Sequence, residues 1–223
     1  MTLNISKGQT AFRLGISSPE QLQTFLEEND RAVGVSFVGR SNVGKSSLIN
    51  TLFRRKVARV SNTPGRTREI NVFEFSIEDD GKLREDLPSF WLFDLPGYGF
   101  AEVPAKVSGN WQELMSVFFQ KVSPAVLMLN LQDARHPNQK SDLSFQDFLT
   151  SFPLETFMVF NKLDKLKKQK ERAQLNKMKP KLYQELKWVK QIHFVSAEDK
   201  QGVDQLEAAL INFLLLKHEA LRV

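Results

Sequence analysis

The strongest chemical pattern in the sequence is a glycine-rich segment, "FVGRSNVGKSSLIN", which follows an apolar run. It fits the pattern G-x-x-x-x-G-K-[ST] with Gly39, Gly44, Lys45 and Ser46. Glycines at these two positions let the backbone fold tightly around phosphate oxygens, which backbone N–H groups and a helix N-terminus can bind. The lysine can reach the outer phosphates, and the serine hydroxyl can ligate Mg²⁺.

This pattern is specific. A chain of this length would match it by chance roughly once in a hundred times, and the strand before it and the helix after it reduce that chance further. The alternative interpretation, a glycine turn followed by a surface lysine, is given little weight. The sequence therefore predicts a nucleoside-triphosphate site. The residues expected around the phosphates are Gly39, Arg40, Ser41, Asn42, Val43, Gly44, Lys45, Ser46 and Ser47.

The stretch "NKLD" at 161–164 ends another apolar run and predicts the loop that recognises the base. A carboxylate at Asp164 can accept hydrogen bonds from both N1–H and the 2-amino group of guanine. Adenine has no such pair of donors, so a buried carboxylate facing it would stay unpaired. GTP is therefore favoured over ATP, and an ATP-dependent enzyme is the disfavoured alternative. The base-side residues are Asn161, Lys162, Asp164 and, in the second strand end "VSA", Val195, Ser196 and Ala197.

The elements that must position these loops alternate along the chain. Strand-like runs occur at 32–39, 70–77, 90–95, 125–131, 156–161 and 192–197, and helical patterns at 45–54, 104–121, 139–151, 167–188 and 203–217. Several strands are almost continuously apolar, as expected for strands covered on both faces. The alternation predicts a three-layer, doubly wound α/β fold with a mostly parallel sheet.

One pair of strands breaks the alternation. The runs at 70–77 and 90–95 are joined by the polar stretch 78–89 without a helix, which predicts an antiparallel hairpin at one edge of the sheet. Residues 1–30 are expected to form an N-terminal extension with a helix capped by Ser18 and Pro19. The expected organisation is this extension, a nucleotide-binding domain over 31–217, and a tail over 218–223.

Composition narrows the class of protein. The 223 residues include no cysteine, which excludes disulfides and Cys-ligated metal. The N-terminus has no signal-peptide h-region, and "LINFLLL" is too short to cross a bilayer. We therefore expect a cytoplasmic protein without membrane insertion. The net charge of +5 is uneven, because 162–190 carries +8 and the rest −3. This segment is either a solvated helix or a nucleic-acid contact.

The ordered set "GRSNVGKS", "TPGRT", "DLPGYG", "NKLD" and "SA" resembles the translation-factor-type small GTPases. More closely, "GRSNVGKSSLIN", "NTPGRT", "DLPGYGFAEVP" and "DARHP" resemble the EngB (YihA/YsxC) family of bacterial GTPases over roughly residues 30–217. This family commonly has a TKAD-type motif where the chain has NKLD, which keeps the lysine and the aspartate. The stretch 78–89 also looks longer than usual. Neither difference touches the nucleotide chemistry.

The resemblance implies that "TPGRT" and "DLPGYG" are the two switch loops of a P-loop GTPase. Thr67 would ligate Mg²⁺ with Ser46, and Asp94 would hold it through a water. The Gly97 N–H would bond the γ-phosphate, so losing that phosphate would release both loops. The switch residues assigned to the nucleotide site are Gly65, Arg66, Thr67, Asp94, Leu95, Pro96 and Gly97.

Two residues bear on the rate of hydrolysis. Tyr98 follows Gly97 where many regulatory GTPases carry a glutamine that positions the attacking water, so we expect slow intrinsic hydrolysis. In related GTPases an asparagine at the position of Asn42 helps to bind K⁺, so K⁺ stimulation is a hypothesis. The residues assigned to catalysis are Lys45, Thr67, Gly97 and Asn42.

The family resemblance implies a switch, expected to be monomeric, that assists assembly of the large ribosomal subunit and is needed for normal division and septation. An alternative is a switch that binds a division or signalling protein and does not touch RNA. His136 is interpreted as a loop or sheet-end residue and His193 as a packed or edge residue, not as catalytic groups. Core residues are expected at Phe73, Phe75, Trp91, Phe93, Leu114, Phe118 and Val122.

Overall fold

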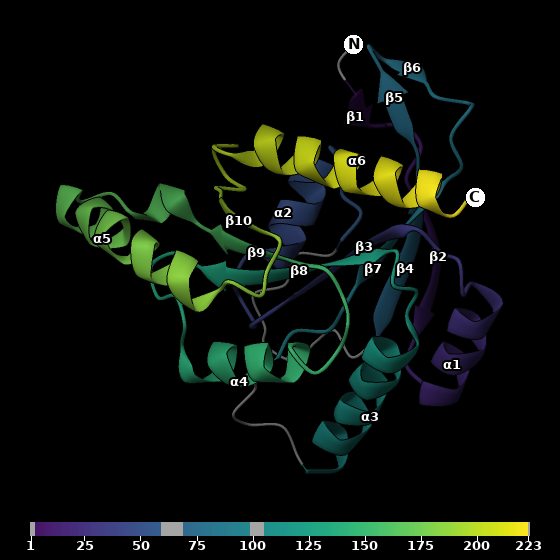
Figure 1. Cartoon of the computed structure of the whole chain (residues 1–223), viewed down its shortest axis with the longest axis horizontal. Helices are drawn as coiled ribbons and strands as arrows, with labels where there is room; N and C mark the ends of the chain where they lie inside the picture. The colour runs from purple at the N-terminus through teal and green to yellow at the C-terminus, as the bar shows by residue number, and fades with distance from the viewer. Residues whose placement is uncertain (1–2, 59–68, 99–104, 223) are drawn as a thin grey trace.

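The computed structural model describes residues 3–58, 69–98 and 105–222 (Figure 1). Its strands are β1 (Leu3–Ile5), β2 (Ala11–Ile16), β3 (Gly34–Gly39), β4 (Ile70–Phe75), β5 (Ile77–Asp79), β6 (Lys82–Leu83), β7 (Phe90–Asp94), β8 (Val126–Asp133), β9 (Thr156–Asn161) and β10 (Gln191–Phe194). Its helices are α1 (Pro19–Glu28), α2 (Lys45–Leu52), α3 (Ala105–Lys121), α4 (Lys140–Leu149), the short 3-10 helix η1 (Leu163–Lys165), α5 (Gln169–Glu185) and α6 (Val203–Ala220).

The main sheet has seven strands in the order β10-β9-β8-β3-β7-β4-β2. The strands from β10 to β7 are parallel, whereas β4 is antiparallel to β7 and β2 is antiparallel to β4. Every residue of β3, β8 and β9 is buried, because helices cover these strands on both faces. The α/β fold with a mostly parallel sheet is therefore confirmed.

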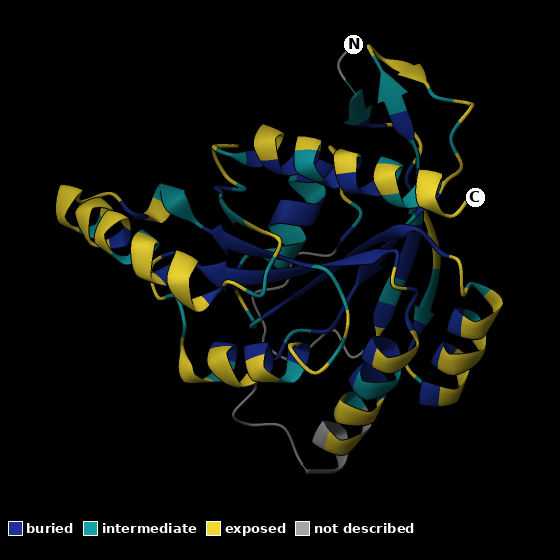
Figure 2. Cartoon of the chain, in the orientation of Figure 1, coloured by how far each residue is buried: buried dark blue, intermediate teal, exposed yellow. Residues whose placement is uncertain are grey.

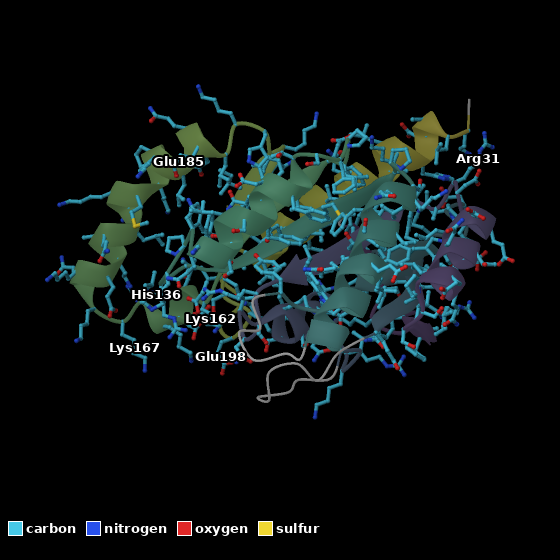
Figure 3. All side chains as sticks on the ribbon, turned by 90° about the horizontal axis from the view of Figure 1, so that it is seen from below. Arg31, His136, Lys162, Lys167, Glu185 and Glu198 are labelled. Carbon is cyan, nitrogen blue, oxygen red and sulfur yellow. The ribbon has the colours of Figure 1, made fainter. Side chains whose placement is uncertain are left out.

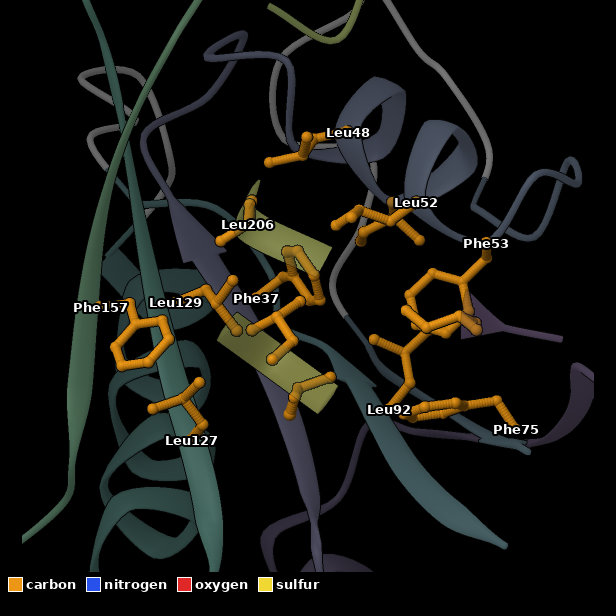
Figure 4. Packing of buried hydrophobic residues seen from close by; sticks show 14 of the residues in the cluster. Phe37, Leu48, Leu52, Phe53, Phe75, Leu92, Leu127, Leu129, Phe157 and Leu206 are labelled. Atoms are coloured by element: carbon orange, nitrogen blue, oxygen red, sulfur yellow. The ribbon is translucent and has the colours of Figure 1, made fainter. Parts of the chain in front are cut away.

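Helices form a layer on each face of the sheet (Figure 1). Side chains of α2 and α6 pack on one face, where Phe37 of β3, Leu129 of β8 and Leu206 of α6 belong to one cluster (Figure 4). Side chains of α1, α3 and α4 pack on the other face, and α5 packs on β9 and β10. Of the residues expected in the core, Trp91 is half-buried. The others are buried: Phe73, Phe75, Phe93, Leu114, Phe118 and Val122.

The N-terminal residues contribute more than the expected capped helix. The helix is present, with Ser18 as N-cap and Pro19 in its first turn. In addition, β2 pairs with β4 and takes the sheet edge, so the β4–β7 hairpin lies one strand inside it. Strand β2 is not evident from the sequence, because "AFRLGI" lacks a continuous apolar run, and three of its six residues are exposed.

A second sheet, β1-β5-β6, forms from residues 3–5 and from residues 77–83, most of which lie in the polar stretch expected only to connect two strands. The Ile5 N–H donates to Oε1 of Glu207 on α6 at 2.8 Å, and Arg54 after α2 donates to Oε2 at 2.9 Å. Burial raises the pKa of Glu207, while the bond from Ile5 and the Arg54 charge oppose that shift. This carboxylate therefore joins β1, the end of α2 and the last helix.

Candidate functional site

The phosphate-binding pattern lies between β3 and α2, as predicted. Gly44 has φ +91°, a left-handed conformation that favours glycine. A Cβ there would lie 2.5 Å from Nδ2 of Asn161, and a Cβ on Gly39 would lie 2.8 Å from the Leu131 carbonyl oxygen. Close approach of neighbouring atoms therefore requires glycine at both positions, and at Gly44 the backbone conformation requires it as well. Asn42, at φ +64°, is a residue type that tolerates this region.

Lys45 opens α2, and its ammonium group forms an ion pair with the carboxylate of Asp94. Asp94 is the last residue of β7, which is parallel to β3, so both groups reach the same edge of the sheet. Both side chains are largely buried, with 12% of the lysine and 6% of the aspartate exposed. The lysine predicted to reach the outer phosphates is therefore in direct contact with the aspartate predicted to hold Mg²⁺ through a water.

The loop after β7 runs close to the phosphate-binding loop. The Tyr98 N–H donates to the Gly39 carbonyl at 3.2 Å, and the Ser41 N–H donates to the Tyr98 carbonyl at 3.1 Å. A Cβ on Gly97 would lie 3.1 Å from the same Gly39 oxygen. Leu95 also donates its N–H to Phe37 of β3. The residues 95–98 are thus fixed beside the loop that the sequence assigns to phosphate.

Asn161 at the end of β9 links three loops. Its Nδ2 donates to the Val43 carbonyl at 3.0 Å, and its Oδ1 accepts from the Ala197 N–H at 3.1 Å. Thr51 of α2 donates its hydroxyl to the Ala197 carbonyl at 2.9 Å. The base-side residues are therefore bonded to the phosphate-binding loop, and Asn161 acts as a link between them.

The carboxylate of Asp164 is held by two side chains. Ser196 Oγ donates to its Oδ1 at 2.9 Å, and Lys165 Nζ lies 3.0 Å from its Oδ2. Partial burial would raise the pKa of Asp164, but these hydrogen bonds outweigh it and the pKa is lowered. The group is therefore ionised at neutral pH, as an acceptor for guanine must be. Val195 completes this loop by accepting the Leu163 N–H.

A carboxylate that is not among the predicted site residues lies next to Lys162. Oδ2 of Asp133, the last residue of β8, is 3.1 Å from Lys162 Nζ and 2.7 Å from Arg135. Burial alone would raise the pKa of Asp133. The hydrogen bonds and charges of Arg135 and Lys162 outweigh this effect and lower the pKa to about 2. Lys162 Nζ also donates to the Asn42 carbonyl. The sequence feature that could have identified Asp133 is its position at the end of an apolar run, where "DARHP" begins.

The Tyr98 side chain points into the protein. It is stacked on Phe145 with ring centroids 4.2 Å apart, and its hydroxyl reaches Asp142 of α4 and Asn130 of β8. Burial and the Asp142 charge raise the pKa of Tyr98, and burial raises the pKa of Asp142. Arg40 Nε lies 3.6 Å from the same Asp142 oxygen. Neither Asp142 nor Asn130 had been predicted.

His136 and His193 agree with their interpretation: His136 is exposed in the loop after β8, and His193 is half-buried in the edge strand β10. Burial lowers the pKa of His193. Ser46 and Ser47 lie in the first turn of α2. Gly65, Arg66 and Thr67 lie outside the described residues. Within 3–58, 69–98 and 105–222, no group of three or more His, Cys, Asp or Glu side chains could hold a metal ion, and no helix is long and apolar enough to cross a membrane.

Comparison with known proteins agrees with this arrangement of loops. Residues 34–162 match the family described as "50S ribosome-binding GTPase". A probable GTP-binding protein EngB from Salmonella paratyphi B is 35% identical over 208 residues, which cover 93% of this chain and 91% of the relative.

Two solved structures share the fold. Era from Aquifex aeolicus, bound to GDP·AlF4⁻, has a TM-score of 0.63 at 22% identity over 82% of this chain and 57% of Era. A probable GTP-binding protein EngB has a TM-score of 0.55 at 24% identity over 82% of this chain and 98% of the other. The length and identity of the sequence match to the Salmonella protein show that this chain belongs to the EngB family, and it is a P-loop GTPase that binds and hydrolyses GTP.

Proposed function

We propose that the protein is a GTP-dependent switch that assists assembly of the large ribosomal subunit in the cytoplasm as a monomer, and that cell division and septation depend on it. The main support for the switch function is the contact between the loop 95–98 and the phosphate-binding loop. A nucleotide phosphate placed there would touch both. The ribosomal part is supported by the matched family's description and by the basic segment 162–190.

The residue roles follow from the arrangement at the sheet edge. Residues 39–47 would surround the phosphates, with Lys45 moving from Asp94 to the outer phosphate oxygens. The Gly97 N–H would bond the γ-phosphate. Asp164, kept ionised by Lys165 and Ser196, would accept the two guanine donors. In the other switch loop, Thr67 would supply a hydroxyl ligand to Mg²⁺, and Gly65 and Arg66 belong to the same motif.

Mg²⁺ suits the donors that this site offers. The assigned ligands are hydroxyls of Ser46 and Thr67 and, through a water, the buried carboxylate of Asp94. These are oxygen donors with a single carboxylate, and Mg²⁺ is commonly bound by one or two carboxylates, waters and substrate phosphates. When bound, the ion would neutralise charge that develops on the phosphate oxygens.

Slow intrinsic hydrolysis follows from the position of Tyr98. Its hydroxyl is committed to Asp142 and its ring to Phe145, so this side chain does not orient a water at the γ-phosphate. A K⁺ ion at Asn42 would supply positive charge from another direction. The Asn42 side chain is exposed, which leaves it free to bind an ion.

The test is co-sedimentation with purified ribosomal subunits on a gradient, in K⁺ buffer at moderate salt. The protein would be loaded with a non-hydrolysable GTP analogue or with GDP, and nucleotide binding would be confirmed separately. We expect comigration with the large subunit only in the GTP-like state. Comigration in neither state would overturn the ribosomal role and direct the search to a protein partner.

A further inference from the structure

Helix α5 is held to the protein by a narrow strip of its surface. Of its residues only Leu175 and Leu182 are buried, and Figure 2 shows the rest of the helix mostly exposed. Lys179 turns inward, with its ammonium 4.6 Å from the centre of the Phe194 ring of β10. The opposite side of α5 therefore projects from the molecule (Figure 3).

The side of α5 that faces away from the protein is basic. Residues spaced by three and four share one helix face, and here they define the α5 outer face: Lys170, Gln174, Lys177, Lys181 and Gln184, all exposed. The three lysines are spread along about 16 Å of helix, from the 1.5 Å rise per residue. Among the described residues, Lys181 pairs with Glu185 at 3.5 Å, whereas Lys170 and Lys177 have no ion pair.

The composition of this face selects one class of partner. A helix that lies on a membrane needs an apolar face turned outward, but the buried leucines of α5, Leu175 and Leu182, pack against β9 and β10, and the outer face consists of lysines and amides. The cores of protein interfaces are depleted in lysine. Exposed lysines with polar amides between them are instead suited to phosphate groups, which many proteins contact without reading sequence.

The face also begins next to the nucleotide site. Asp164 lies in η1, and α5 starts five residues later at Gln169. Figure 3 shows Lys167, before the helix, on the same side of the molecule as Lys162, while Glu185 lies at the far end. A partner bound along α5 would therefore reach the guanine-binding loops.

We propose that the α5 outer face binds the phosphate backbone of ribosomal RNA through Lys170, Lys177 and Lys181. The proposal rests on the proposed ribosomal function and adds the surface that makes the contact. The interaction would be electrostatic and would weaken steeply with salt.

The test compares the wild type, the triple variant Lys170→Gln/Lys177→Gln/Lys181→Gln, and a matched triple variant Lys7→Gln/Lys82→Gln/Lys121→Gln. The matched lysines are exposed and lie on other parts of the chain, so the change in net charge is equal. The probes are a fluorescently labelled 20-base-pair RNA duplex, titrated at several KCl concentrations, and purified large ribosomal subunits. Thermal unfolding of all three proteins checks that they are folded.

We expect the α5 variant to bind the duplex at least about 10-fold more weakly than the wild type, with a salt slope shallower by about 1 for each lysine removed. The α5 variant should also no longer bind large ribosomal subunits, whereas the matched variant should bind both probes as the wild type does. If both triple variants bind the duplex and the subunits as tightly as the wild type does, the α5 contact is overturned and the ribosomal function stands. Wild-type protein that binds the duplex but no subunit would instead overturn the ribosomal function. An equal loss in both triple variants would show a general charge effect and also overturn the α5 contact.

Discussion

The Tyr98 hydroxyl lies 3.1 Å from Oδ1 of Asp142, which joins the end of the DLPG loop to the first turn of α4. The hydroxyl carries one proton, and the carboxylate is the acceptor that receives it. The same Asp142 uses its Oδ2 to accept the Gln139 N–H at the start of α4. Tyr98 is therefore a structural anchor between the nucleotide-binding loops and α4, on the sheet face that α1 and α3 also cover.

Tyr98→Phe should lower the free energy of unfolding by about 1–3 kcal/mol, because it leaves the buried Asp142 carboxylate without its hydroxyl donor. Urea denaturation would measure it. Tyr183→Phe is the control, since Tyr183 is 52% exposed on α5 and should change stability by less than about 0.5 kcal/mol. Equal effects of the two substitutions would contradict the anchor.

Gly44→Ala should reduce nucleotide affinity as well as stability, because its Cβ would displace Asn161 from Val43. We expect mant-GDP to bind at least about 10-fold more weakly. Gly81→Ala is a matched control: Gly81 has φ +80°, but nothing lies within 4 Å of the added Cβ. The control should show only the strain of a left-handed alanine, about 1–2 kcal/mol, with normal nucleotide binding. Normal binding by Gly44→Ala would show that the close approach to Asn161 is not needed.

Asp164→Asn should move base preference from guanine towards xanthine, since the amide presents a donor where the guanine N1–H needs an acceptor. Fluorescent analogues of GTP and XTP would measure the two affinities, and their ratio should change by about 100-fold or more. Asp147→Asn, an exposed change on α4, should leave the ratio as it is. A variant at Asp164 that still prefers GTP would overturn the base assignment.

Asp133→Asn should destabilise the protein in a pH-dependent way. The pKa of Asp133 is about 2, below the ordinary 3.8, because Arg135 and Lys162 favour the ionised form despite burial. The stability that this carboxylate contributes is therefore present above about pH 4 and is lost as pH falls towards 2. Urea midpoints of the two proteins should differ most near neutral pH and converge below pH 4. A difference that does not change with pH would mean that the charge of Asp133 is not responsible.

Hydrolysis should be faster in K⁺ than in Na⁺ at matched ionic strength, if a cation bound at Asn42 helps to stabilise the transition state. Asn42→Ser should remove the difference between the two salts, while Asn176→Ser, an exposed change on α5, should retain it. Phosphate release under single-turnover conditions would measure the rates. Equal rates of the wild type in both salts would refute the cation site.

The site loops after β3 and β9 could be predicted because each follows a run of apolar residues that is buried on both faces of the sheet. Parallel strands bring such loops to one edge, so Gly44, Asp94 and Asn161 could be grouped before any coordinates were known. These runs leave little choice of structure, since burying them requires helices on both sides.

The contacts that sequence reasoning missed are of two kinds. Strand β1 has three residues and β2 is largely exposed, so neither carries a clear apolar period. The partners of Tyr98 are separated from it by 32 and 44 residues, and only the packed fold brings them together. A buried aspartate near the start of a helix, such as Asp142, looks in sequence like an ordinary capping residue.

The bond between Ile5 and Glu207 also sets an order of events during synthesis. The two residues are 202 positions apart, and ribosomes add about 5–20 residues per second. Once Ile5 has been made, roughly 10–40 s pass before its acceptor exists, by that same rate. Strand β1 therefore stays without its α6 partner while the rest of the domain is translated, and the newly made protein reaches its final form only after α6 has left the exit tunnel.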